Sequence, residues 1–128
     1  MPREAYWKAK RAVIIPREQG TYFKVDDALR CVICYPNSYY VGMSNLGFQT
    51  AYWYFNRREE TKAERAFFEA DVPALTIESA RPLSDFPLIG FSVCFELDCI
   101  NILSMLSLAG IPLLRSARTA AHPLIFVG

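Results

Sequence analysis

The sequence predicts an α/β fold of the Rossmann-like or flavodoxin-like class, with a doubly wound parallel sheet. Short apolar runs that are typical of strands alternate with amphipathic runs that are typical of helices. The first of these runs, residues 31–35, is apolar on both faces, which indicates a strand covered on both sides. Strands that alternate with helices are joined by crossovers and form parallel sheets. We therefore expect this strand near the centre of the sheet.

The beginning of the chain has no clear period. Residues 1–29 mix charged, polar and apolar side chains, and Gly20 interrupts them. We expect this segment to form an extended N-terminal arm, with at most a short helix at its start. Residues 30–128 then form the α/β domain.

Strands and helices are expected in alternation along this domain. The sequence predicts strands at 31–35, 63–68, 88–95 and 123–128, and helices at about 44–57 and 98–109. Ser44 and Asp98 are suited to be the N-caps of the two helices. Gly110 and Pro112 end the second helix.

The last expected strand closes the sequence without a covering helix. A strand that is buried on both faces is not expected to be the final element of a complete doubly wound domain. We therefore expect a C-terminally truncated domain that lacks its last strand and helices. The chain would then be the N-terminal part of a longer protein.

Composition and charge favour a single globular domain. Hydrophobic residues make up 52% of the 128 residues, charged residues make up 21%, and the net charge is +1. This balance gives no electrostatic basis for binding nucleic acid or an anionic membrane. The charged N-terminus lacks the apolar core of a signal peptide. The longest apolar stretch, residues 99–114, is interrupted and falls short of the ~20 residues that span a bilayer. We expect a cytoplasmic protein.

The cysteines and the single histidine do not show the spacing of a metal site. Cys31 and Cys34 lie three apart in a strand, so they point to opposite faces and are expected to be buried thiols. Cys94 and Cys99 straddle a turn and could approach each other, but no histidine lies nearby. His122 precedes the fourth strand, where we expect a surface loop.

Three small polar turns are predicted to meet at one edge of the sheet. They are residues 36–47 after the first strand, residues 92–98 after the third, and Gly128 at the end of the fourth. Ligands of open α/β sheets bind beyond the carboxyl ends of the strands, where the strand order reverses. We expect a binding site there, although Gly, Asn and Ser are also ordinary turn residues.

The residue types in these turns suggest roles in binding. Gly42 and Gly47 would let the backbone approach a ligand closely. Free N–H groups near Ser44 and Asn45 could hold a phosphate or an amide oxygen. The spacing fits neither the dinucleotide fingerprint nor a P-loop. Exposed tyrosines at the first turn could stack on a flat ligand, and Glu96 could contact ligand amides or a partner domain. The expected cofactor-binding residues are Asn37, Tyr39, Tyr40, Gly42, Ser44, Asn45, Gly47, Ser92, Glu96 and Gly128.

Three segments together resemble the N-terminal cobalamin-binding-type domain of B12-binding radical SAM proteins. They are YPNSYYVGMSNLGFQTAYWYFN, ESARPLSDFPLIGFSVCFELDCINILSMLSLAGIPL and HPLIFVG. The resemblance covers residues 30–128 in order, with short gaps. It implies a Rossmann-like domain that carries cobalamin in front of a radical SAM barrel, in the same chain or in a partner. It also implies that residues 39–47, residues 92–96 and the turn begun by Gly128 face the cobalamin.

The sequence departs from the full pattern of that family. It has no CxxxCxxC, the motif with which the barrel holds a [4Fe–4S] cluster that cleaves S-adenosylmethionine. Those two cofactors are therefore expected only in a parent protein. It has no Asp-x-His-x-x-Gly either, so we expect no histidine of this chain on cobalt. We expect no catalytic residue and no metal ligand in the chain itself.

Two other functions remain open at this point. The chain could be a non-enzymatic docking or assembly domain that keeps the fold without cobalamin, which the absent histidine motif favours. It could also be a flavodoxin-like domain that binds FMN. That function needs a Ser/Thr-rich phosphate loop after the first strand, and residues 37–45 are a poor version of one.

Overall fold

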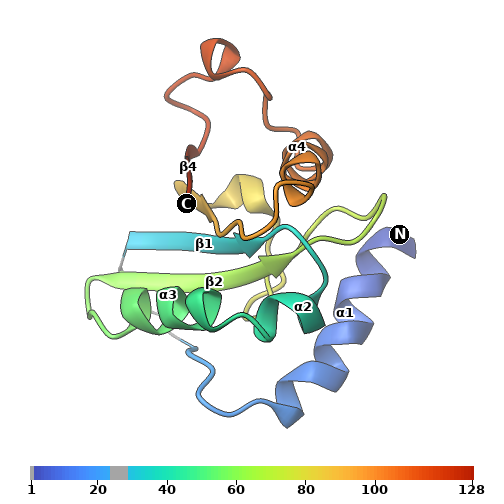
Figure 1. Ribbon diagram of the computed structural model, residues 1–128, viewed down its shortest axis with the longest axis vertical. Helices are drawn as coiled ribbons and strands as arrows, with labels where there is room; N and C mark the ends of the chain where they lie inside the picture. Colours follow the sequence, from blue (N-terminus) through green and yellow to red (C-terminus); the bar gives the residue numbers. More distant parts are fainter. Residues whose placement is uncertain (1, 24–28) are drawn as a thin grey trace.

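A computed structural model describes residues 2–23 and 29–128 and places the strands in one parallel sheet (Figure 1). The strands of the described ranges are β1 (Leu29–Tyr35), β2 (Thr61–Phe67), β3 (Leu88–Phe91) and β4 (Leu124–Val127). Their order is β2-β1-β3-β4, and all three pairings are parallel. This is the start of the flavodoxin-like order, with β1 inside the sheet and the strand order reversing between β1 and β3. The predicted fold class is confirmed.

The strands differ from prediction mainly at their ends. β1 and β2 each begin two residues early, and β3 ends four residues before the predicted position. After β3 the backbone still contacts its neighbours, because Ser92 N donates to Cys34 O at 2.9 Å and Val93 N donates to Gly128 O at 2.9 Å. The chain then turns away, which ends the strand.

The first predicted helix is two helices. Ser38 is the N-cap of α2 (Tyr39–Met43) and accepts a hydrogen bond from Val41 N. Asn45 is the N-cap of α3 (Leu46–Asn56), where its side chain accepts from Phe48 N at 2.9 Å. The prediction of Ser44 as an N-cap is therefore wrong by one residue, because the Asn45 side chain reaches the free N–H.

The second predicted helix is α4 (Asp98–Leu108). Its N-cap position is Leu97, which makes no side-chain capping bond. The prediction of Asp98 as N-cap is wrong, because Asp98 already has helical geometry and its side chain turns to another partner. Short 3₁₀ turns complete the description: η1 (Ile15–Arg17), η2 (Leu83–Asp85) and η3 (Arg115–Ala117).

The N-terminal arm is not extended. Its residues 2–14 form α1 (Pro2–Ile14), a helix of 13 residues. The side chain of Trp7 is fully buried, and Tyr6 donates a hydrogen bond to Glu69 Oε2 at 2.7 Å. Arg11 donates to the carbonyl oxygens of Ile77 and Glu78. These contacts fix α1 against the domain. Residues 24–28 of the predicted arm lie outside the described residues.

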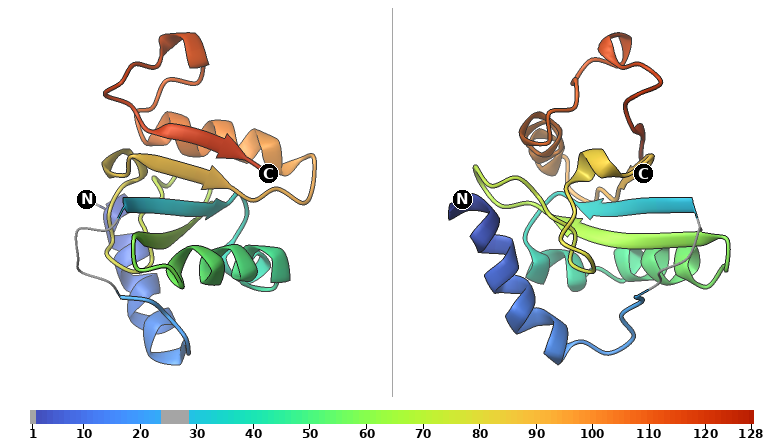
Figure 2. Two further views of the ribbon diagram at one scale, coloured as in Figure 1. Left: turned by 90° about the vertical axis from the view of Figure 1, so that its left-hand side faces the viewer. Right: turned by 180° about the vertical axis from the view of Figure 1, so that it is seen from behind.

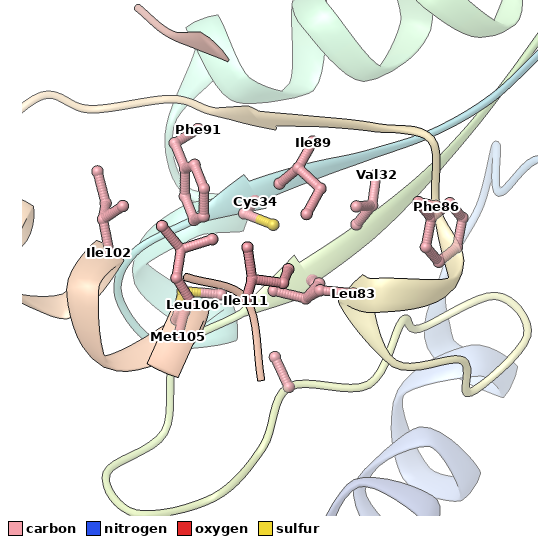
Figure 3. Packing of buried hydrophobic residues seen from close by; sticks show 12 residues of the cluster. Val32, Cys34, Leu83, Phe86, Ile89, Phe91, Ile102, Met105, Leu106 and Ile111 are labelled. Atoms are coloured by element: carbon pink, nitrogen blue, oxygen red, sulfur yellow. The ribbon is translucent and has the colours of Figure 1, made fainter. Parts of the chain in front are cut away.

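Helices cover both faces of the sheet, as a doubly wound fold requires. Side chains of β1 alternate between two cores: Val32 and Cys34 pack with α4, and Ile33 and Tyr35 pack on the side of α1 and α3. Figure 3 shows the first core, in which Ile102, Met105 and Leu106 of α4 meet the sheet residues. β1 is thus buried on both faces, which confirms the expectation for this strand.

The two edges of the sheet differ in how they are covered. At the β2 edge, Arg65 N donates to Glu78 Oε1 at 2.9 Å, and Ile77 N donates to Arg65 O at 2.8 Å. At the other edge, β4 has three exposed residues out of four. Within the described ranges, none of the helices is long and apolar enough to cross a membrane.

Candidate functional site

The turns after β1 and β3 meet at the carboxyl edge of the sheet. Figure 2 shows β1, β3 and β4 side by side with their arrowheads pointing the same way. Asn37 Nδ2 donates to Asp98 Oδ1 at 3.2 Å, and Asn45 Nδ2 donates to Cys94 Sγ at 3.0 Å. Asn101 of α4 donates to the carbonyl oxygen of Pro36 at 2.8 Å. These bonds hold the two turns together at the point where the strand order reverses.

Asp98 places an unpaired hydrogen-bond acceptor at this edge. The residue is 7% exposed, and its Oδ1 is bound to Asn37. Its Oδ2 is buried and accepts no hydrogen bond from the described residues. Burial raises the pKa of the neighbouring Tyr35 hydroxyl, and Cys94 and the Asp98 carboxylate add to this shift. A buried carboxylate oxygen without a donor is costly, and a ligand that donates a hydrogen bond would remove that cost. Analysis of the sequence missed this role because Asp98 fits the pattern of a helix cap.

Several predicted site residues are brought together at this edge. Asn37 and Asn45 join the two turns through the bonds described above. Ser92 lies beside them at the end of β3, with its backbone paired to β1. Gly128 N donates to Phe91 O at 3.0 Å, so the end of β4 lies next to the same turn. The prediction that three turns converge is therefore confirmed for their backbones.

The adjacent tyrosines of α2 differ in exposure. Tyr40 is 65% exposed, and its ring lies edge-to-face against that of Tyr39, with centroids 5.5 Å apart, and 5.7 Å from Lys10 Nζ of α1. Tyr39 is half-buried, packs its ring against Phe67 with centroids 5.1 Å apart, and donates from its hydroxyl to Glu18 Oε2 at 2.5 Å. Burial and the Glu18 carboxylate raise the pKa of Tyr39. Tyr39 therefore faces the N-terminal segment, away from the meeting point of the turns.

The predicted glycines also differ. Gly47 is exposed at the start of α3. Gly42 is buried, and a Cβ atom there would lie 2.5 Å from Phe67 Cε1 and 3.0 Å from Tyr35 Cβ. The absence of a side chain at Gly42 thus allows α2 to pack on β1 and β2, a structural reason that was not foreseen.

Exposed side chains surround the carboxyl edge. Ser44 and Glu96 are exposed there, and Ser44 Oγ donates to Tyr40 O at 2.6 Å. Large apolar side chains are exposed on the same turns and on the adjoining helix ends. We call this set the apolar rim: Tyr40, Val41, Leu46, Phe95, Leu97 and Ile100.

The thiols and the histidine lie in different environments. All four cysteines are free, and burial raises the pKa of Cys31 to about 11 and raises that of Cys34 further. His122 accepts a hydrogen bond from Thr119 N at 2.9 Å and lies at the amino end of β4, as predicted. The described parts of the chain contain no cluster of three or more His, Cys, Asp or Glu residues that could hold a metal ion.

Comparison with known proteins identifies a family. Residues 47–128, more than half of the chain, match the model of a family described as radical SAM proteins, N-terminal. The match includes α3, β2, β3, α4 and β4, and it begins after the turn that follows β1. Comparisons with curated proteins and with solved structures give no match.

Proposed function

We propose that this chain, which belongs to the family of N-terminal regions of radical SAM proteins, binds cobalamin at the carboxyl edge of its sheet and presents it to a radical SAM domain. The observation that supports this most is that Asn37 and Asp98 join two turns where the strand order reverses, and that the buried Oδ2 of Asp98 has no hydrogen-bond donor among the described residues. Such positions bind ligands in doubly wound folds.

The residues at this edge fit the periphery of cobalamin. The corrin ring is a broad apolar surface whose side chains end in amides, and amide N–H groups would match the buried Oδ2 of Asp98. Phe95 of the apolar rim supplies exposed aromatic surface on the turn that leads to Asp98. His122 is the single histidine and lies at the opposite edge, so this chain would place no imidazole on cobalt.

The chain's own contribution is binding and orientation. Asp98 accepts a hydrogen bond from the ligand and Asn37 keeps the carboxylate in place, while the apolar rim excludes water from the bound face. Cobalamin, when bound, supplies cobalt-centred chemistry to the neighbouring domain. The [4Fe–4S] cluster and S-adenosylmethionine belong to that radical SAM domain, in the same chain or in a partner.

A second candidate function is docking to the radical SAM domain without cobalamin. It is favoured because two predicted binding residues already have partners within the protein. Tyr39 donates a hydrogen bond to Glu18, and Gly42 packs against Phe67. The apolar rim would then be covered by protein rather than by a cofactor. The FMN alternative gains no support, because Ser38 in the first turn caps α2 instead of remaining free for phosphate.

The test is a visible-absorption titration of the purified chain with hydroxocobalamin, followed by desalting. The proposal predicts retained and shifted corrin bands in the wild type. Asp98→Ala should weaken binding about 10- to 150-fold, as expected for loss of about 1.5–3 kcal/mol from one hydrogen bond to a charged group. Glu60→Ala, which changes an exposed glutamate, is the matched control. No retained colour in a chain that is folded by circular dichroism would favour the docking function.

A further inference from the structure

A buried arginine on β2 is bound by two carboxylates from distant parts of the chain. The side chain of Arg65 is 2% exposed. Its Nε donates to Glu78 Oε2 at 2.8 Å, and Tyr52 Oη donates to the same oxygen at 2.6 Å. Glu78 Oε1 accepts from Arg65 N at 2.9 Å. Glu78 thus accepts three hydrogen bonds, two of them from Arg65.

The other carboxylate comes from the segment that follows η1. We call residues 18–22 the strap. Glu18 of the strap binds the guanidinium in a bidentate manner: Nη1 donates to Oε2 at 2.6 Å and Nη2 donates to Oε1 at 2.7 Å. Tyr39 and Thr21 also donate to this carboxylate. We call the two terminal nitrogen atoms of Arg65, Nη1 and Nη2, the Arg65 fork. The geometry of the Arg65 fork matches the two oxygen atoms of a planar carboxylate.

The two carboxylates differ in exposure, although Glu18 accepts four hydrogen bonds and Glu78 accepts three. The side chain of Glu78 is 2% exposed and that of Glu18 is 9% exposed. Burial raises the pKa of Glu78 more than the Arg65 charge lowers it. Burial would also raise the pKa of Glu18, but the hydrogen bonds from Arg65, Tyr39 and Thr21 and the Arg65 charge together outweigh it and lower the pKa. Two carboxylates share one guanidinium, and Glu18 is the one on the open side.

A cavity of about 360 Å³ lies beside this ion pair. The strap forms one wall, and α2 and α3 form the other. The part of the wall outside the strap includes Tyr39, Met43, Gln49, Tyr52, Trp53 and Arg65. A volume of this size holds a small organic molecule, and its aromatic walls suit an apolar or aromatic group next to the carboxylate.

We propose that the Arg65 fork and the Tyr39 hydroxyl form a binding site for the carboxylate of a small organic acid, and that Glu18 fills this site in the absence of the ligand. The incoming carboxylate takes the two Nη bonds, and the strap moves away with Glu18. Arg65 keeps Glu78 in both states. The site is independent of the carboxyl edge, since the amide side chains of cobalamin carry no carboxylate.

The experiment uses 3-phenylpropionate as the probe and 3-phenylpropionamide as its neutral control, with calorimetric titration of the full chain. An internal competitor weakens apparent affinity, so Glu18→Ala should bind the acid about tenfold more tightly than the wild type. Glu18→Gln keeps the side-chain shape, so its affinity for the acid should lie between that of the wild type and that of Glu18→Ala. Glu60→Ala, whose side chain is 74% exposed, should behave as the wild type does.

A second readout follows the strap in the wild-type protein. Arg17 is exposed and directly precedes Glu18, so trypsin can report release of the strap by cleavage after Arg17. The acid should accelerate this cleavage and the amide should not. The proposal is overturned if neither Glu18 variant, when folded, prefers the acid over the amide, or if the acid leaves cleavage after Arg17 unchanged in the wild type.

Discussion

The two edge strands of the sheet, β2 and β4, differ in how they are covered by the rest of the chain. At the β2 edge, residues 75–82 and α1 cover the strand, and the backbone of Arg65 is paired on its outer side. At the β4 edge, Leu124 is 69% exposed although Ile89, on the neighbouring strand β3, is completely buried. β4 is therefore paired on one side only within the described part of the chain.

This difference separates a side of the protein that internal contacts stabilise from a side that has exposed apolar surface. The β2 side combines a buried ion network with the core beneath α1 and α3. The β4 side and the neighbouring carboxyl edge expose apolar residues that water does not favour. We expect mutations on the first side to change stability and mutations on the second to change association.

The largest effect is expected for Arg65→Met. This change leaves Glu18 and Glu78 buried without their counter-charge, and breaking a buried network in this way costs about 3–5 kcal/mol. Urea unfolding of the chain measures the loss. Arg58→Met, in an exposed pair with Glu60, is the control and should change the free energy of unfolding by less than about 0.5 kcal/mol. Equal losses in the two variants would show that the β2 side is not held by this network.

Glu18→Gln should cause the next largest decrease in the free energy of unfolding, and this decrease should depend on pH. Hydrogen bonds to a charged group contribute about 1.5–3 kcal/mol. Because the pKa of Glu18 is lowered in the folded protein, this stabilisation is complete above the unfolded value near 4.5 and is lost as the pH falls below it.

Unfolding of the wild type and Glu18→Gln should therefore be compared between pH 7 and pH 3. The difference between them should be constant near neutral pH and should shrink below pH 4.5. A difference that grows on acidification would contradict the assigned charge of Glu18.

Two buried glycines allow a direct comparison of the two sides. A Cβ at Gly42 would contact the buried ring of Phe67, whereas a Cβ at Gly90 would lie 2.4 Å from the ring of Phe126, which is partly exposed on β4. Gly42→Ala should cost about 1–3 kcal/mol because Phe67 cannot move. Gly90→Ala should cost less than about 1 kcal/mol because Phe126 can turn into solvent. Thermal unfolding separates the two, and the reverse order would mean that the β4 side is the more rigid one.

The smallest effect on stability is expected for Leu124→Ser. Its side chain is already in water, so the free energy of unfolding should change by less than about 0.5 kcal/mol. The matched change Ile89→Ala, in the buried core, should cost about 2–5 kcal/mol. If the β4 side meets the radical SAM domain, Leu124→Ser should still weaken that association, which a pull-down with the separately produced domain can measure. Unchanged association would place the contact elsewhere.

Local patterns in the sequence were sufficient for the parallel sheet and for the place of the first strand inside it. Each predicted strand exists in the structure. Apolar runs between polar turns could predict these strands because the pattern involves only residues that are close together in the sequence. The convergence of turns also followed, since the carboxyl ends of parallel strands share one edge. Cap positions were less reliable: Asn45 rather than Ser44 caps α3, because two adjacent small polar residues compete for the same N–H.

Interactions between distant residues could not be predicted in the same way. Glu18 and Arg65 are 47 residues apart, and no local period relates them. A signal was nevertheless present, because Glu64 and Arg65 are charged residues in the middle of a strand with Ala63 and Ala66 on either side. Buried charges need partners, so these two residues indicated that partners exist, but the sequence did not say that they are Ser79 for Glu64 and Glu18 and Glu78 for Arg65. The burial of α1 on the domain is a consequence of such contacts.

The most direct test of the proposed cofactor function is hydrogen exchange of the chain with and without hydroxocobalamin, read by mass spectrometry. The proposal predicts slower exchange in residues 36–46 and 92–100, the two turns that Asn37 and Asp98 join. It predicts no change at the strap or at the amino end of β4 near His122. Protection confined to those other regions, or no protection anywhere, would contradict cobalamin binding at the carboxyl edge.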